Sequence, residues 1–179
     1  MKKNIIYYGL ISGTIVSVFM LLSMNYLSHC EGKVNYSISM LIGYASMLIA
    51  FSLVFVGIRN YRDQYYNGVI SFGKAFKTGI LIALIASTMY VVSWLIYFFF
   101  FSPDFIDKYS ARQLEELRAS GAVQAEIDKQ AKEMADFAIM YKNPFFNALM
   151  TYLEILPVGF IVTLISAFIL KRETSSSLT

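Results

Sequence analysis

Glu154 is a carboxylic acid inside an otherwise apolar stretch, TYLEILPVG, and Pro157 follows three residues later. If this stretch spans a bilayer, an ionised carboxylate within it costs about 2.5 to 3.5 kcal/mol on insertion scales. A protonated acid, or an acid paired inside a helix bundle, is the cheaper state. Because Pro157 cannot donate a hydrogen bond to the carbonyl of Leu153, it weakens the helix beside the acid. An acid next to a freed helix carbonyl is typical of proton or ion pathways.

Neutral polar side chains accompany this acid. The spacing of Asn147, Thr151 and Glu154 places all three on one face of a helix. Residues of other helices that could face them are Tyr90, Ser87, Ser46 and Tyr44. Two interpretations remain open for Glu154. It is either a protonated acid that hydrogen-bonds neighbouring helices together, or a coupling carboxylate for transport.

Catalytic and metal-binding patterns are absent from the sequence. The apolar stretches hold no Ser/His/Asp or Cys/His set, and the chain has no HExxH motif. Its one histidine, His29, is followed by Cys30 and Glu31, and three consecutive ligands cannot easily converge on one ion. The segment NGVISFGKAFKTG (67–79) lacks the Gly-Lys-Ser ending of a phosphate-binding loop. We therefore expect neither an enzyme nor a bound metal or other cofactor.

Four long apolar runs must position these residues. Of the 179 residues 57% are hydrophobic and 15% charged, which is too apolar for an ordinary soluble domain. A bilayer core of about 30 Å needs about 20 apolar residues of helix, and each run reaches that length. We predict an all-α integral membrane bundle, organised as one domain, in the lipid bilayer. Its four transmembrane helices are expected over about residues 5–27, 37–58, 78–102 and 145–170.

The distribution of Lys and Arg predicts the orientation of these helices. Segment 59–77 carries four basic residues against one acid, and both ends of the chain are basic. Basic short loops face the cytoplasm, so we expect the N- and C-termini and this loop to be cytoplasmic. The net charge of +3 is explained by this asymmetry, and we expect no binding to nucleic acid.

Segment 103–143 is the largest polar part, with six basic and eight acidic residues. Ser110 and Gln113 form a capping-box pattern that predicts the start of a short helix, which Gly121 can close. A second helix is expected from about Val123 to Tyr141, before Asn143-Pro144. The pattern predicts a two-helix insert on the side opposite the basic loop. We expect its apolar face to lie on the membrane surface or on the outer mouth of the bundle. Binding of a partner protein in the periplasm is the alternative.

Small residues recur at helical spacing in two of the runs. Gly9, Gly13 and Ser17 share one face of the first, and Gly79 and Ala83 share one face of the third. Small residues let neighbouring backbones approach closely in membranes. These faces are expected to pack either within the chain or between copies of a homo-oligomer.

Two stretches carry a resemblance: GVISFGKAFKTGILIALIASTMYVV (68–92) and MYKNPFFNALMTYLEILPVGFIVTLISAFILKR (140–172). Through them the chain resembles a family of bacterial membrane proteins, domain of unknown function 4199, common in Bacteroidetes-type bacteria. The resemblance implies a multi-pass protein of a Gram-negative inner membrane, with segment 103–143 in the periplasm. It supplies no reaction, ligand or catalytic residue.

Two function hypotheses follow from the sequence. The first is a non-enzymatic scaffold or accessory membrane protein that presents the periplasmic insert. The alternative is a small proton- or ion-coupled transporter that acts as an oligomer, with Glu154 as the coupling carboxylate.

Overall fold

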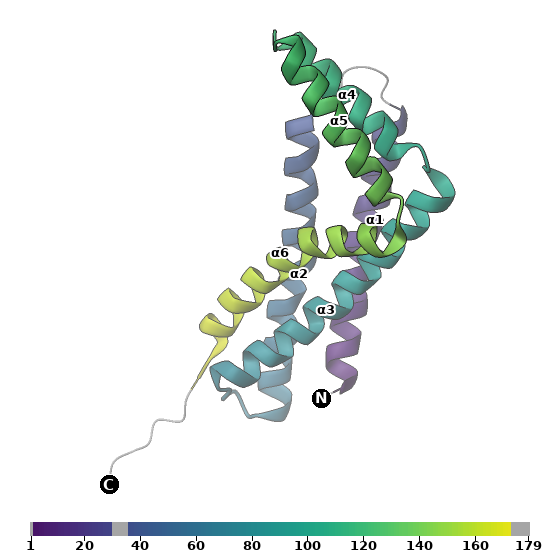
Figure 1. Ribbon diagram of the computed structural model, residues 1–179. Coiled ribbons are helices and arrows are strands. Elements are labelled where there is room, and N and C mark those ends of the chain that lie inside the picture. The colour runs from purple at the N-terminus through teal and green to yellow at the C-terminus, as the bar shows by residue number, and fades with distance from the viewer. Residues whose placement is uncertain (1, 30–35, 173–179) are drawn as a thin grey trace. The chain divides into compact units, whose positions relative to one another are not determined.

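The computed structural model of the protein describes residues 2–29 and 36–172. These residues form six α-helices and one π-helical turn (Figure 1): α1 (Lys2–His29), α2 (Tyr36–Tyr65), α3 (Phe72–Ile96), η1 (Tyr97–Phe101), α4 (Phe105–Ala119), α5 (Gln124–Tyr141) and α6 (Pro144–Leu170). Four segments are long and apolar enough to cross a membrane: Lys3–Asn25, Leu41–Tyr65, Phe72–Phe101 and Pro144–Leu170. The predicted all-α class with four long apolar helices is confirmed, and two shorter helices, α4 and α5, precede the last of them.

The segment expected as a loop over 59–77 is helical at both ends, because charged residues end the apolar run without ending the helix. α2 continues to Tyr65, and Arg59 pairs with Asp63 one helical turn later at 3.8 Å. The chain then reverses at Asn67 and Gly68, whose φ angles are 49° and 82°. Glycine and asparagine tolerate this left-handed backbone better than other residues, which explains why the chain turns at this pair.

The chain divides into two compact units. Among the described residues, the four-helix unit contains 2–29, 36–91 and 152–172. The hairpin unit contains 92–151.

Helices of the four-helix unit contact one another at glycines. A Cβ atom added to Gly9 would lie 2.7 Å from Ile85 Cβ, and one added to Gly13 would lie 2.8 Å from Met89 Cβ. Separations this short mean that the backbone of α1 lies directly against side chains of α3. Ser12 Oγ donates to the carbonyl of Ala50 at 2.7 Å and so joins α1 to α2.

Glycines also allow close contact between α3 and α6. A Cβ atom at Gly79 would lie 2.7 Å from Thr163 Cγ2, and one at Gly159 would lie 3.1 Å from Ala83 Cβ. Beyond the ends of these helices, the backbones of Ile70 and Arg172 exchange two hydrogen bonds of 3.1 and 2.9 Å. The segment before α3 is thereby fastened to the residues after α6.

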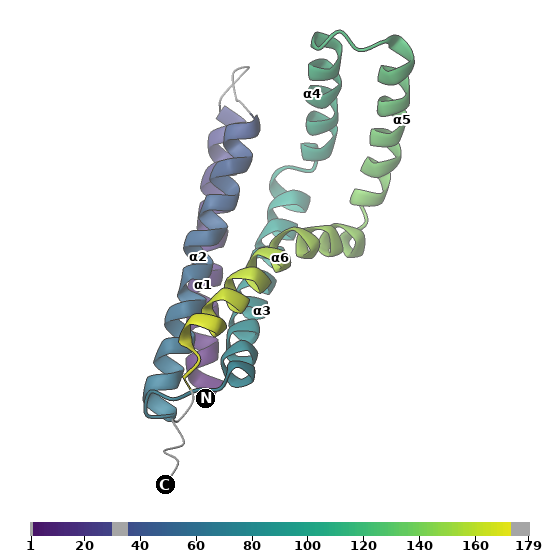
Figure 2. The same ribbon diagram turned by 90° about the vertical axis from the view of Figure 1, so that its left-hand side faces the viewer.

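The hairpin unit contains α4 and α5, which run antiparallel (Figure 2). The predicted capping box at Ser110 was wrong, because α4 already begins at Phe105 with Asp104 as its N-cap. Pro103 ends the preceding helix, so the chain restarts earlier than the local Ser-Gln pattern suggests. Gly121 follows α4 with φ 81°, which confirms the predicted glycine stop. The Lys108 ammonium lies 2.7 Å from Asp104 and, by this hydrogen bond, lowers the pKa of that carboxyl.

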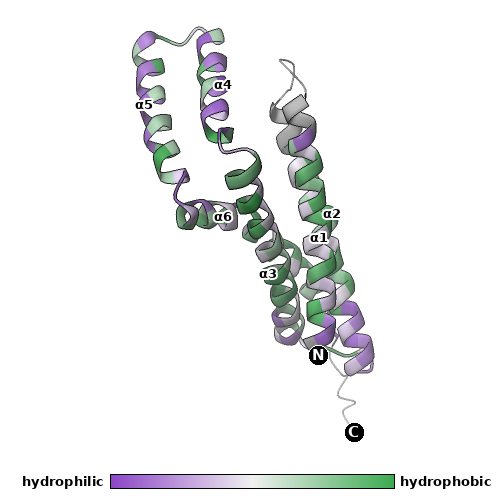
Figure 3. Cartoon of the chain, turned by 90° about the vertical axis from the view of Figure 1, so that its right-hand side faces the viewer, coloured by the Kyte–Doolittle hydropathy of each residue, from purple (hydrophilic) through white to green (hydrophobic). Residues whose placement is uncertain are grey.

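Hydrophilic residues alternate with apolar ones along α4 and α5, whereas α3 is almost continuously hydrophobic (Figure 3). The hairpin has a small apolar core, since only Ile106, Ile127 and Ala138 of these two helices are buried. An ion pair of 3.2 Å between Lys142 Nζ and Asp107 Oδ2 joins the end of α5 to the start of α4.

Candidate functional site: a buried amide and an exposed acid

Asn147 is fully buried and is the centre of a polar network in the hairpin unit. Its Oδ1 accepts a hydrogen bond of 2.9 Å from the indole N–H of Trp94. Its Nδ2 donates to the carbonyl of Tyr141 at 3.2 Å. Thr151 Oγ1 donates to the Asn147 carbonyl at 2.8 Å. The amide therefore connects α3, the end of α5 and the first turns of α6.

The start of α6 fixes the position of this amide. Asn143 Oδ1 accepts hydrogen bonds from the backbone N–H groups of Phe145 and Phe146, at 2.9 and 3.4 Å. Pro144 occupies the first helical position, where its lack of an N–H costs nothing. With the helix start set in this way, Asn147 lies one turn further along, on the buried face.

Aromatic rings surround the network. The Trp94 ring lies 5.2 Å from Phe105, 6.0 Å from Phe98 and 6.2 Å from Tyr97, measured between ring centroids. Rings at these distances exclude water, which strengthens the hydrogen bonds they enclose. The bonded groups are an amide, an indole, a hydroxyl and a carbonyl, none of which exchanges a proton near neutral pH. The network can hold helices together, and it has no group for acid–base chemistry.

Glu154 lies elsewhere, on the exposed side of α6 in the four-helix unit. Its carboxyl makes no hydrogen bond or ion pair with any residue that the structure describes. Leu153, 59% exposed, and Pro157 are exposed with it. Residues 2–29 and 36–172 of a single chain therefore do not provide the hydrogen bonds that an interhelical role of Glu154 requires.

The other predicted members of the site are dispersed. Tyr90 is buried on α3. Ser46 Oγ donates to the carbonyl of Gly43 within its own helix, at 2.7 Å. Ser87 is buried and has no hydrogen-bond partner among the described residues. The structure thus brings Asn147 and Thr151 together, with a partner that the sequence reasoning had not assigned to them.

That missed partner is Trp94, to which the sequence alone assigned no role at the site. A buried tryptophan almost always needs an acceptor for its indole N–H. This was the one signal that could have identified it. A second missed contact is the hydrogen bond of 2.9 Å from the Tyr152 hydroxyl to Thr88 Oγ1, which joins α6 to α3 within the four-helix unit.

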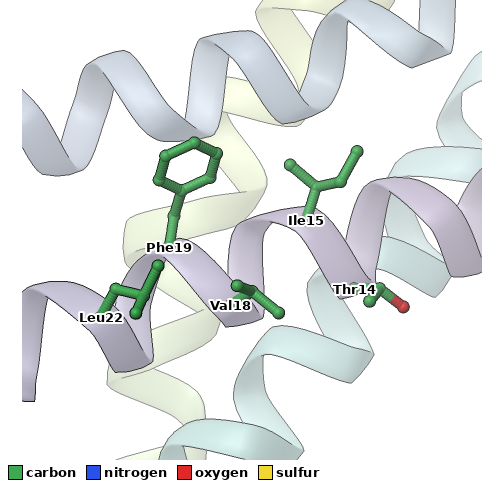
Figure 4. A pocket seen from close by; sticks show the side chains of 5 residues that line it. All are labelled: Thr14, Ile15, Val18, Phe19 and Leu22. Carbon is green, nitrogen blue, oxygen red and sulfur yellow. The ribbon is translucent and has the colours of Figure 1, made fainter.

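A depression on the outer face of α1 is a poor site for chemistry (Figure 4). Its lining residues are Thr14, Ile15, Val18, Phe19 and Leu22. One hydroxyl among four apolar side chains suits a lipid chain better than a polar substrate. No group of three potential metal ligands occurs among residues 2–29 and 36–172. Cys30 and Glu31, and the side chain of His29, lie outside the described parts of the chain.

The model of the family described as "Protein of unknown function (DUF4199)" matches residues 7–172, which include the buried network and Glu154. The chain belongs to the DUF4199 family. This confirms the resemblance inferred from residues 68–92 and 140–172. No curated protein matches the chain, and no solved structure matches it. Membership of DUF4199 adds no activity, so the function must be argued from the residues themselves.

Proposed function

We propose that this DUF4199 protein is a non-enzymatic scaffold or accessory protein of the bacterial inner membrane. In this role it presents the α4–α5 hairpin to a partner protein in the periplasm. One observation carries the proposal. In the sequence, a charged helical hairpin, Phe105–Tyr141, separates two apolar helices that are long enough to span a bilayer.

The surface of the hairpin supports this role. Most of its charged side chains are exposed, and its two helices bury few apolar residues against each other. Val123 and Ile139 remain 67% and 72% exposed. Apolar side chains exposed among charges are typical of surfaces that bind another protein.

The charge distribution supports the orientation. Arg59, Arg62, Lys74 and Lys77 lie on or next to the turn between α2 and α3, and Lys171 and Arg172 follow α6. The α2–α3 turn and the segment after α6, which carry these residues, would therefore face the cytoplasm. The hairpin would lie on the other side of the membrane.

The orientation is tested by labelling single cysteines in a Cys30→Ser chain with a membrane-impermeant maleimide on spheroplasts. Exposed hairpin positions, Ala111→Cys and Ala125→Cys, should be labelled from outside. The exposed positions Gln64→Cys and Asn67→Cys should be labelled only after the membrane is opened. The reverse pattern would contradict the proposed orientation.

The role of the hairpin is tested by complementation of a deletion strain. A chain whose residues 105–141 are replaced by a short Gly/Ser linker should reach the membrane and fail to restore the phenotype. The matched control is Gly43→Ala, because no atom lies within 4 Å of the added methyl group. Rescue by the chain without a hairpin, at equal membrane abundance, would refute the scaffold role.

A transporter is the second candidate, and the position of Glu154 favours it. The acid lies beside the Leu153 carbonyl, which Pro157 deprives of its helical donor. An amide cannot release a proton, so under this hypothesis Glu154→Gln should abolish function at normal abundance. Full rescue by Glu154→Gln would exclude proton-coupled transport and leave the scaffold.

A further inference from the structure

We propose that two copies of this chain pair in the membrane through the exposed face of α6, with Glu154 in the contact. The occupant of this face is a second copy, related to the first by a twofold axis.

The faces rich in small residues cannot serve this purpose. Gly9 and Gly13 are covered by Ile85 and Met89 of the same chain, and Gly79 is covered by Thr163. A second copy could reach these glycines only by displacing α3 or α6. Self-association must therefore use an outer face of the bundle.

One outer face of α6 carries exposed, mostly apolar residues at helical spacing. Its residues recur at intervals of three and four and form a continuous stripe: Glu154, Pro157, Ile161, Ile165 and Phe168. Ile161, Ile165 and Phe168 are 54%, 53% and 54% exposed. This is the spacing with which one helix meets another along a seam.

At one end of this stripe, an acid and a helix carbonyl lack their usual hydrogen-bond partners. The Glu154 carboxyl is unpaired among the described residues, and the Leu153 carbonyl receives no bond from Pro157. Lipid chains offer neither donors nor acceptors, so each unsatisfied group is costly there. The stripe is therefore unfavourable as a surface that faces lipid alone.

A second copy supplies what these groups need. At a twofold axis a residue meets its own equivalent, so Glu154 faces Glu154. Two neutral carboxyl groups each donate one hydrogen bond and accept one, and they satisfy each other without a cation. An ion pair between copies is not available, because residues 5–27, 37–58, 78–102 and 145–170 contain no Lys or Arg. A different partner would need a hydrogen-bonding side chain at the same depth within its own membrane span.

The test is oxidative crosslinking of single cysteines in a Cys30→Ser chain, in membranes and after purification in mild detergent. Ile161→Cys lies on the stripe and should give a disulfide-linked dimer. The control is Leu84→Cys on α3, which is also exposed, at 40%. It lies at a similar depth, since its neighbour Ala83 contacts Gly159. Leu84→Cys should remain monomeric.

Substitution of the acid completes the test. Added to Ile161→Cys, Glu154→Gln keeps a donor and an acceptor and should retain the dimer. Glu154→Leu should weaken the dimer roughly 3- to 30-fold, the range expected for hydrogen bonds between membrane helices. Equal crosslinking at Ile161 and Leu84, or a dimer unaffected by Glu154→Leu, would overturn the proposal. Crosslinking of Ile161→Cys to a different protein, with a monomeric purified chain, would also overturn it.

This pairing does not depend on the role proposed for the hairpin. A chain without residues 105–141 should still form the Ile161 crosslink. Failure of that chain to restore function would therefore concern the scaffold, whereas loss of the crosslink in the intact chain concerns only the pairing.

Discussion

Replacement of Asn147 by leucine should destabilise the protein by about 2 kcal/mol. Leucine has a similar size and fits a buried position, so the change tests the hydrogen bonds rather than the packing. It leaves the Trp94 indole N–H without its acceptor at 2.9 Å. It also removes the hydrogen bond of 3.2 Å that the amide donates to the Tyr141 carbonyl.

The magnitude follows from the loss of these two hydrogen bonds. A buried donor or acceptor that loses its partner costs about 1 to 3 kcal/mol, whereas a hydrogen bond between membrane helices contributes on average about 0.6 kcal/mol. Removal of the buried amide itself offsets part of the cost, which leaves about 2 kcal/mol. That is more than a tenfold change in the unfolding equilibrium.

Trp94 is the only tryptophan, so its fluorescence reports directly on this bond. In Asn147→Leu its emission should shift to shorter wavelength, and denaturant unfolding in detergent should begin earlier. Thr151→Val is the control, because it removes only a hydroxyl bonded within its own helix. Its stability should change by less than about 0.5 kcal/mol. An Asn147→Leu chain with unchanged emission and stability would refute the network.

The remaining predictions concern substitutions of three glycines. Gly9→Val should lower thermal stability by about 1 to 3 kcal/mol, because even its Cβ would lie 2.7 Å from Ile85 Cβ. Gly43→Ala, with open space around the added methyl group, should leave stability unchanged or raise it by up to about 1 kcal/mol. Equal melting temperatures for the two variants would contradict the close contact of α1 with α3. Gly121→Ala should cost about 1 to 2 kcal/mol within the hairpin, because the φ of 81° is strained for alanine. Limited proteolysis between α4 and α5 should detect it, and an unchanged cleavage rate would count against the left-handed turn.

The apolar helices could be predicted from the sequence because bilayer thickness imposes a length that a run of uncharged residues reveals directly. Their ends could not, since the charges at Arg59 and Asp63 end the apolar run and still stabilise another turn of α2. The capping box at Ser110 failed for a related reason. A pattern of four residues carries no information about Pro103, which ends one helix and allows the next to begin.

The partner of Asn147 depended on helix rotation, which the sequence does not specify. The π-helical turn Tyr97–Phe101 begins three residues after Trp94 and changes the angular position of the residues that follow it, among them Phe105 beside the Trp94 ring. Five consecutive aromatic residues give no periodic signal from which such a turn could be predicted. Likewise, the spacing of Gly9 and Gly13 predicted close packing but not its partner. Only the contacts with Ile85 and Met89 place that packing within one chain.

The reciprocal backbone bonds between Ile70 and Arg172 have a consequence for biogenesis. The segment before α3 leaves the ribosome about a hundred residues ahead of its pairing partner, so it must wait for the final helix to insert. Fusion of a reporter directly after Leu170 would remove Arg172 and leave two backbone groups of Ile70 unpaired. Reporters used to follow this protein in cells are therefore better joined beyond Arg172, where the finished pairing is preserved.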